Sequence, residues 1–130
     1  STGIGTVADS LVAIKKLVFE EKRLTLRELW EILKNNFEGH EALRMELDRR
    51  MPCFGNDDAE VDEIARRVFA AYTDAVHRCN DGSVPGCFLT VMFSYTGHIS
   101  QGEVVFATPN GRLKGETISN GIGPSQGKDV

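Results

Sequence analysis

Hydrophobic residues in the first part of the chain recur at the three- and four-residue spacing that is typical of amphipathic helices. A capping-box pattern at Thr6–Asp9 predicts the start of a first helix, and the apolar arc that follows is wider than a surface helix needs. A second capping box at Thr25–Glu28 predicts another helix, whose apolar positions are expected to face inward, namely Leu26, Leu29, Trp30, Ile32, Leu33 and Phe37. The first helix should therefore be covered on most of its sides.

Two more helices are expected before residue 80. A narrow apolar line through Leu43, Leu47 and Met51 predicts a charged third helix over residues 40–50, which Pro52 ends. Residues 55–58 form a turn that leads into the N-cap of a fourth helix, which ends near Arg78.

The hydrophobic period changes after the loop at residues 80–86. Cys87–Tyr95 is rich in β-branched and aromatic residues, which predicts a strand buried on both faces, and a shorter strand is expected at Glu103–Ala107. The predicted fold class is therefore α/β, seen in this piece as a helix-rich α+β arrangement. Its helical part covers residues 1–80, and its strand and glycine-rich loop part covers residues 86–130.

Glycine is frequent after the first predicted strand, in a segment without low-complexity repeats. This density indicates backbone that passes close to other groups. The Gly3-Ile4-Gly5 and Gly121-Ile122-Gly123 sequences could also suggest anion binding, but neither completes a phosphate-binding pattern, and turn geometry is the better interpretation.

The predicted elements cannot complete a fold among themselves. A pair of strands is marginal in water, and the first helix is too apolar for the protein available to cover it. We therefore expect residues 1–130 to form one segment of a larger protein.

Composition narrows the functional classes. The 130 residues carry a net charge of −4, without the basic patch that nucleic-acid binding usually requires. The longest apolar run is too short to cross a bilayer, and no signal peptide is visible. Three cysteines without paired spacing favour a reducing compartment, so we expect a cytoplasmic protein without nucleic-acid or membrane partners.

Candidate chemistry is sparse. The three histidines His40, His77 and His98 lie in different elements without metal-ligand spacing, so no metal site is predicted. Free cysteines such as Cys53 and Cys87 are more often small buried hydrophobes than nucleophiles.

Thr96 and His98 are the candidate substrate-binding residues. They follow the predicted core strand next to glycines that allow close approach, a common place for a pocket wall. A strand end that simply reaches solvent explains the same pattern, and the residues alone leave both readings open.

Several motifs, taken together and in order, resemble the glycyl radical enzymes of the pyruvate formate-lyase type. The resemblance covers nearly the whole chain, through the residues at 5–19, 35–39, 54–58, 107–112 and 121–129. The first of these is similar to the stretch that follows the catalytic cysteine loop in that family. Gly123–Gly127 is more similar to the dehydratase, decarboxylase and lyase branch than to pyruvate formate-lyase itself.

The resemblance implies a segment of a large ten-stranded β/α barrel with a buried radical site. The parent enzyme would carry a glycyl radical, installed by an activating enzyme that uses S-adenosylmethionine and an iron–sulfur cluster. It would cleave a small molecule by dehydration, decarboxylation or C–N or C–S lysis, in anaerobic metabolism and as a homodimer. The expected partners are the rest of the barrel, the activating enzyme and the small-molecule substrate.

The catalytic motifs of the family do not occur in this chain. Neither the Cys-x-Glu pattern of the family's cysteine nor the Arg-Val-x-Gly-Tyr pattern of its radical glycine is found, so no catalytic residue is assigned. This segment is expected to bind no cofactor and to be inactive alone. The alternatives are formate C-acetyltransferase activity in the parent enzyme, and a stand-alone domain for binding or assembly without catalysis.

Overall fold

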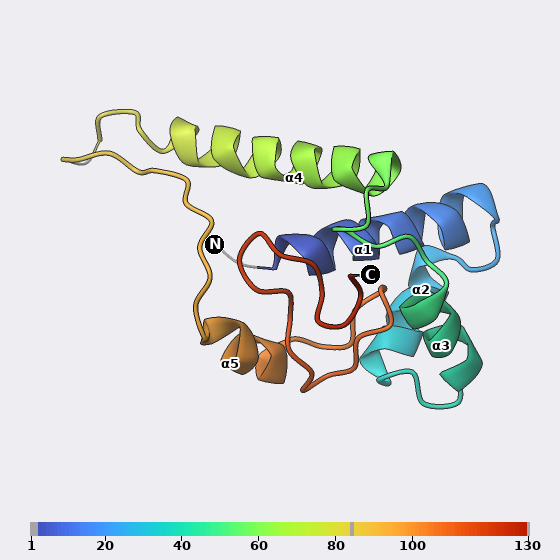
Figure 1. The fold of residues 1–130 in the computed structure, drawn as a ribbon. Helices are drawn as coiled ribbons and strands as arrows, with labels where there is room; N and C mark the ends of the chain where they lie inside the picture. The colour runs from blue at the N-terminus through green and yellow to red at the C-terminus, as the bar shows by residue number, and fades with distance from the viewer. Residues whose placement is uncertain (1–2, 84, 130) are drawn as a thin grey trace.

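A computed structural model describes residues 3–83 and 85–129 of the chain (Figure 1). The helical elements in this part are α1 (Ile4–Ile14), the π-helical η1 (Lys15–Glu20), α2 (Leu26–Lys34), α3 (Glu41–Arg49), α4 (Ala59–Arg78) and α5 (Gly97–Val104). Helix α1 and its π-helical continuation form the longest central element, and α4 lies alongside α1.

The second and fourth predicted helices begin where their local signals place them. Thr25 Oγ1 accepts a hydrogen bond from the backbone N–H of Glu28, while the Glu28 carboxylate accepts from the Thr25 N–H, which completes the capping box of α2. Asp58 caps α4 by accepting from the N–H groups of Glu60 and Val61. These caps satisfy donors that the first turn of a helix leaves unpaired.

The predicted capping box at Thr6–Asp9 is wrong. Helix α1 already begins at Ile4, with Gly3 as its N-cap, so Thr6 and Asp9 lie inside the helix and are buried. Their side chains bind segments distant in the sequence, because the surrounding protein offers them partners that a local pattern does not reveal.

The apolar side chains form two clusters on either side of α1. The larger one joins the second half of the first helix to α2, α3 and the last part of the chain; it contains Ala13, Leu17, Leu29, Ile32, Leu33, Phe37, Leu47 and Ala107. The smaller one joins the start of α1 to α4 and contains Ile4, Ala8, Val12, Val61 and Ala65. Burial of apolar area of this kind is the main stabilising contribution to the fold. Not every predicted inward position takes part: Leu26 and Trp30 are both more than half exposed.

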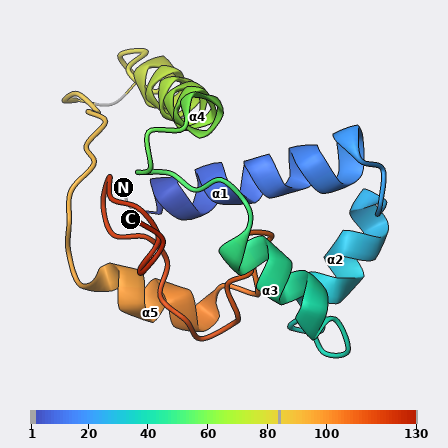
Figure 2. The same ribbon diagram turned by 45° about the vertical axis from the view of Figure 1, so that its right-hand side comes forward.

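The segment at 105–129, which we call the tail, folds back between α1 and α5. Both views of the ribbon show it there, so residues from the two ends of the chain lie side by side (Figures 1 and 2). Close approach requires glycine at two positions: a Cβ atom on Gly5 would lie 2.7 Å from the Gly123 carbonyl oxygen, and one on Gly102 would lie 2.2 Å from that of Glu116. The expectation of close backbone approach concerns the glycines after the first predicted strand. It is confirmed at Gly102, whereas a Cβ atom on Gly115 or Gly127 would meet nothing within 4 Å.

The predicted strands are absent from the part of the chain that the structure describes. Cys87–Tyr95 is extended but belongs to no strand, and it is exposed at Phe88, Leu89, Val91 and Phe93, instead of buried. The second predicted strand overlaps the end of α5. A helix satisfies its hydrogen bonds within itself, whereas a strand needs a neighbour, and this chain provides no neighbouring strand among its described residues. The barrel expectation therefore applies only to a larger parent protein.

Candidate functional site

The two predicted substrate-binding residues lie on the first turn of α5. Thr96 is the N-cap residue and is exposed, whereas His98 is half-buried. The Nδ1 atom of His98 lies 2.7 Å from the carbonyl oxygen of Tyr95, and Gln101 Nε2 donates to Tyr95 Oη at 2.7 Å. These bonds fix the ring of His98 and the phenol of Tyr95 at one end of α5. Thr96 and His98 thus lie two residues apart at the start of α5, and their contact with a substrate stays a prediction.

Two buried hydroxyl residues join the start of α1 to the tail. The backbone N–H of Thr6 donates to Ser119 Oγ at 3.0 Å, and the N–H of Ser119 donates to Thr6 Oγ1 at 2.8 Å. The pair is reciprocal, and both residues are buried. Such an arrangement satisfies polar groups that would be costly to bury alone, so it holds residues 113 positions apart in a fixed register.

Asp9 forms a second link between α1, the tail and the loop before α4. Its Oδ1 accepts from the N–H of Phe54 at 2.7 Å, and its Oδ2 accepts from Ser125 Oγ at 2.8 Å. Burial raises the pKa of Asp9, and the hydrogen bonds from Phe54 and Ser125 and the nearby charge of Lys128 only partly oppose that effect. This carboxyl is a structural acceptor, enclosed by its partners.

Arg112 is the centre of the largest hydrogen-bond cluster. Its guanidinium is almost fully buried and donates to five backbone carbonyls, among them Gly102 at 3.3 Å, Leu113 at 2.9 Å and Glu116 at 2.6 Å, with Val105 and Phe106 as the others. Its Nε also donates to Thr108 Oγ1 at 3.2 Å. The carbonyls of Gly102 and Val105 belong to the C-terminal end of α5, where a cation is favoured by the helix dipole. Arg112 therefore fixes the helix that carries Thr96 and His98.

A polar hollow of about 430 Å³ lies beside this cluster, between α3 and the tail. Lys128 Nζ crosses it, donating to the carbonyl of Asn110 at 2.6 Å and pairing with Asp48 at 3.2 Å. Arg44 and Arg112 are two further cations among its lining residues.

No set of side chains in this region resembles a catalytic centre. Burial raises the pKa of the Cys53 thiol, which disfavours the nucleophilic thiolate. Among residues 3–83 and 85–129, no group of three or more His, Cys, Asp or Glu side chains could hold a metal ion, and none of the helices is long and apolar enough to cross a membrane. What the site can do is position backbone: its charged and hydroxyl groups bind carbonyls, N–H groups and one another.

Sequence reasoning placed Thr96 and His98 at the end of a strand, whereas they lie at the start of helix α5, and it missed the buried polar cluster. The available signal was polar residues, Thr6, Asp9 and Ser10, on a helix whose other faces are apolar, together with the polar motifs at 107–112 and 121–129. Those motifs served to recognise a family, and their roles as partners of α1 and α5 became visible only in three dimensions.

Comparison with known proteins identifies that family. The family model described as pyruvate formate lyase-like matches residues 1–102, and the chain belongs to this family of glycyl radical enzymes. It is 46% identical over 129 residues to the isethionate sulfite-lyase of Oleidesulfovibrio alaskensis, covering 98% of this chain and 15% of that protein. It is 41% identical over 131 residues to the trans-4-hydroxy-L-proline dehydratase of Clostridioides difficile, covering 98% of this chain and 16% of the relative.

Solved structures agree in fold. The hydroxyproline dehydratase from C. difficile with its substrate bound superimposes with a TM-score of 0.87 at 41% identity, over 99% of this chain and 16% of that one. The B12-independent glycerol dehydratase from Clostridium butyricum gives a TM-score of 0.90 at 36% identity, over 98% of this chain and 16% of that one. The chain thus spans about 15% of the length of the curated relatives it matches.

Proposed function

We propose that this chain is the structural wall of the substrate cavity in a glycyl radical lyase or dehydratase that acts on a small polar molecule. One observation carries the proposal: nearly the whole chain aligns both with a sulfite-lyase and with a dehydratase, while its fold superimposes on two dehydratases. A segment shared by enzymes that differ in the bond they cleave is suited to a common structural task.

The residues of this chain position other groups and carry no radical step. Arg112 holds α5, while Thr6 and Asp9 hold the tail against the start of α1. The reacting cysteine and glycine would come from other parts of the same polypeptide. A separate radical-activating enzyme would install the glycyl radical, and the parent would be a cytoplasmic enzyme of anaerobic metabolism and a homodimer.

Thr96 and His98 are proposed to contact the substrate. A threonine hydroxyl and an imidazole both offer hydrogen bonds to a hydroxyl, carboxylate or sulfonate group. Their neighbouring bonds support this role, because His98 is held through Tyr95 and does not have to be ordered when a ligand binds.

The test uses the full-length protein that contains this chain, activated under anaerobic conditions by a radical-activating enzyme. We expect a glycyl radical signal in electron paramagnetic resonance spectra, and turnover of at least one of three probes: glycerol, trans-4-hydroxy-L-proline or isethionate. A full-length protein that forms no radical would contradict the proposed class of enzyme.

The substrate wall is tested in the same enzyme with Thr96→Val and His98→Gln. Each substitution removes or alters a hydrogen bond, so KM should rise about tenfold, corresponding to one lost hydrogen bond, while the yield of radical stays the same. Ser100→Ala is the matched control, because Ser100 is exposed on the same helix and bonds only the Gly97 carbonyl, at 3.2 Å. Unchanged kinetics in both test variants would show that this end of α5 lies away from the substrate.

A further inference from the structure

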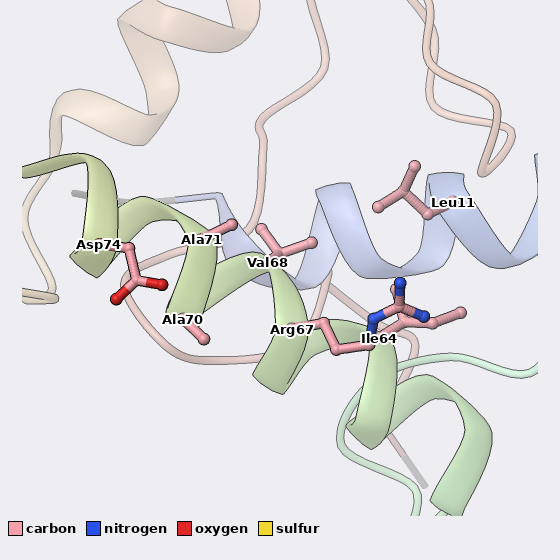
Figure 3. Close-up of a pocket in the computed structure, with 7 residues that line it drawn as sticks. All are labelled: Leu11, Ile64, Arg67, Val68, Ala70, Ala71 and Asp74. Atoms are coloured by element: carbon pink, nitrogen blue, oxygen red, sulfur yellow. The ribbon is translucent and has the colours of Figure 1, made fainter.

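An open groove of about 630 Å³ runs along α4 beside α1 (Figure 3). Its lining residues are Leu11 on α1 together with Ile64, Arg67, Val68, Ala70, Ala71 and Asp74 on α4. Leu11 is 39% exposed, which is high for a large apolar side chain next to other apolar residues. This groove lies away from α5 and the tail, so it takes no part in the site described above.

The shape of the groove suits an element of secondary structure. From Ile64 to Asp74 it follows eleven residues of helix, whose ten steps span roughly 15 Å at the helical rise. Ala70 and Ala71 have the smallest side chains along it and are exposed, so another backbone can approach α4 closely there. A long, shallow surface of this kind fits a second helix better than a small ligand, which usually occupies an enclosed cleft.

The groove also carries opposite charges seven residues apart. Arg67 lies near Ile64 and Leu11, and Asp74 lies at the far end (Figure 3). Elsewhere on α4, Glu60 pairs with Lys15 and Arg66 pairs with Glu63, whereas Asp62 and Arg78 form no ion pair within the described residues. Within residues 3–83 and 85–129, neither Arg67 nor Asp74 takes part in an ion pair. The groove therefore presents an apolar floor with an unpaired cation at one end and an unpaired anion at the other.

We propose that this groove binds a helix from the part of the same polypeptide outside residues 1–130. That helix presents an apolar stripe to Leu11 and Val68, with an acidic residue facing Arg67 and a basic residue facing Asp74. The inference rests on the proposed function, because it needs a parent protein longer than this chain. The relatives support that need, since the aligned part is only about 15% of their length.

Chemical labelling tests the groove in the full-length protein. Ala71→Cys places a thiol on its floor, and Ala59→Cys places the same thiol on the exposed first residue of α4, outside the groove. Reaction with a bulky maleimide is followed by digestion and mass spectrometry, which separates these sites from the natural Cys79 and Cys87. We expect the Ala71→Cys thiol to react about tenfold more slowly than the Ala59→Cys thiol, because a docked helix must move before the reagent can enter.

The outcomes separate the proposal from its alternatives. Equal labelling rates would overturn it, and protection that disappears on dilution would also overturn it, because the occupant would then be a second copy of the protein. Adding Arg67→Glu to Ala71→Cys should speed labelling about threefold by placing like charges face to face; an unchanged rate would contradict an acidic residue opposite Arg67. Formation of the glycyl radical is a separate readout, so the groove and the proposed enzymatic class can fail independently.

Discussion

The tail at 105–129 and the extended segment at 87–95 have opposite relations to the rest of the chain. The tail is irregular in backbone but held by buried hydrogen bonds, through Ser119, Ser125 and Arg112. The extended segment has the composition of a core strand, yet its large side chains Leu89 and Phe93 are 73% and 51% exposed. A regular hydrophobic pattern, as in residues 87–95, therefore does not mean that the segment finds its contacts within this chain.

The comparison separates side chains whose partners lie within the described residues from large apolar side chains that stay exposed there. Buried polar groups need partners, and those of the tail find them on α1, α5 and the tail itself. Exposed apolar residues in a contiguous patch usually mark an interface. The buried polar groups of the tail thus have their partners within the chain, although its Phe106 and Ile122 are 51% and 66% exposed, whereas the extended segment leaves most of its large apolar side chains exposed.

The largest expected effect comes from removing the guanidinium at the centre of the tail. Arg112→Ala leaves five carbonyls, one buried and four partly buried, without this donor, so the free energy of unfolding should fall by about 3–5 kcal/mol. Arg112→Lys keeps the charge but has only three donors, so it should lose about half as much. Urea denaturation of the full-length protein, followed by circular dichroism, measures both.

Arg44→Ala is the matched control for this cluster. Arg44 lines the same hollow but makes one long bond, 3.4 Å to the carbonyl of Gly111, so its removal should cost less than about 1 kcal/mol. Equal losses in Arg44→Ala and Arg112→Ala would show that the carbonyl cluster does not stabilise the tail.

Asp9 gives the next largest effect, and one that depends on pH. Asp9→Ala leaves the partly buried Phe54 N–H and the buried Ser125 hydroxyl without an acceptor, which should cost about 2–3 kcal/mol. Asp9→Asn keeps an oxygen for Phe54 and can donate to Ser125, so it should cost less than about 1 kcal/mol.

The pH dependence of Asp9 follows from its raised pKa. Because the folded-state pKa lies above the ordinary value of 3.8, the folded protein binds a proton more readily than the unfolded chain. This contribution to stability is present below the unfolded-state pKa and is lost as the pH rises through the folded-state pKa. Asp9→Asn should remove that slope from stability measured at successive pH values above 3.8. An unchanged slope would assign it to other carboxyls.

Local signals in the sequence were enough to predict most of the helices. Thr25–Glu28 and Asp58 mark helix starts because the bonds they make lie within three residues of the cap. The same reasoning failed at Thr6–Asp9, because Thr6 and Asp9 form hydrogen bonds with residues more than 40 positions away in the sequence. Sequence analysis thus predicts structure well where the deciding hydrogen bond is local.

The predicted strand at 87–95 failed for a related reason. Its pattern describes a buried environment, and that environment depends on strands that the described residues do not contain. Thr96 and His98 were proposed as substrate-binding residues because glycines flank them, and that role stays a prediction, whereas Arg112 was only part of a family motif. Nothing near Arg112 in the sequence indicates that its partners are carbonyls of α5 and the following turns.

The smallest expected effect concerns the anchor of the extended segment. The Asn80 side chain donates to the carbonyl of Phe88 at 2.9 Å and accepts from its N–H at 2.7 Å, the two bonds that a neighbouring strand would make. Asn80→Ala should therefore loosen residues 87–95 by about 1 kcal/mol and speed chymotrypsin cleavage after Phe88 about fivefold.

Asn80→Asp keeps the acceptor alone and should give an intermediate rate. Asp81→Ala, which removes only the local bond to the Ser83 N–H, should leave the rate unchanged. If Asn80→Ala is cleaved no faster than the unsubstituted protein, Asn80 does not anchor the segment. Contacts with other parts of the polypeptide would then hold residues 87–95.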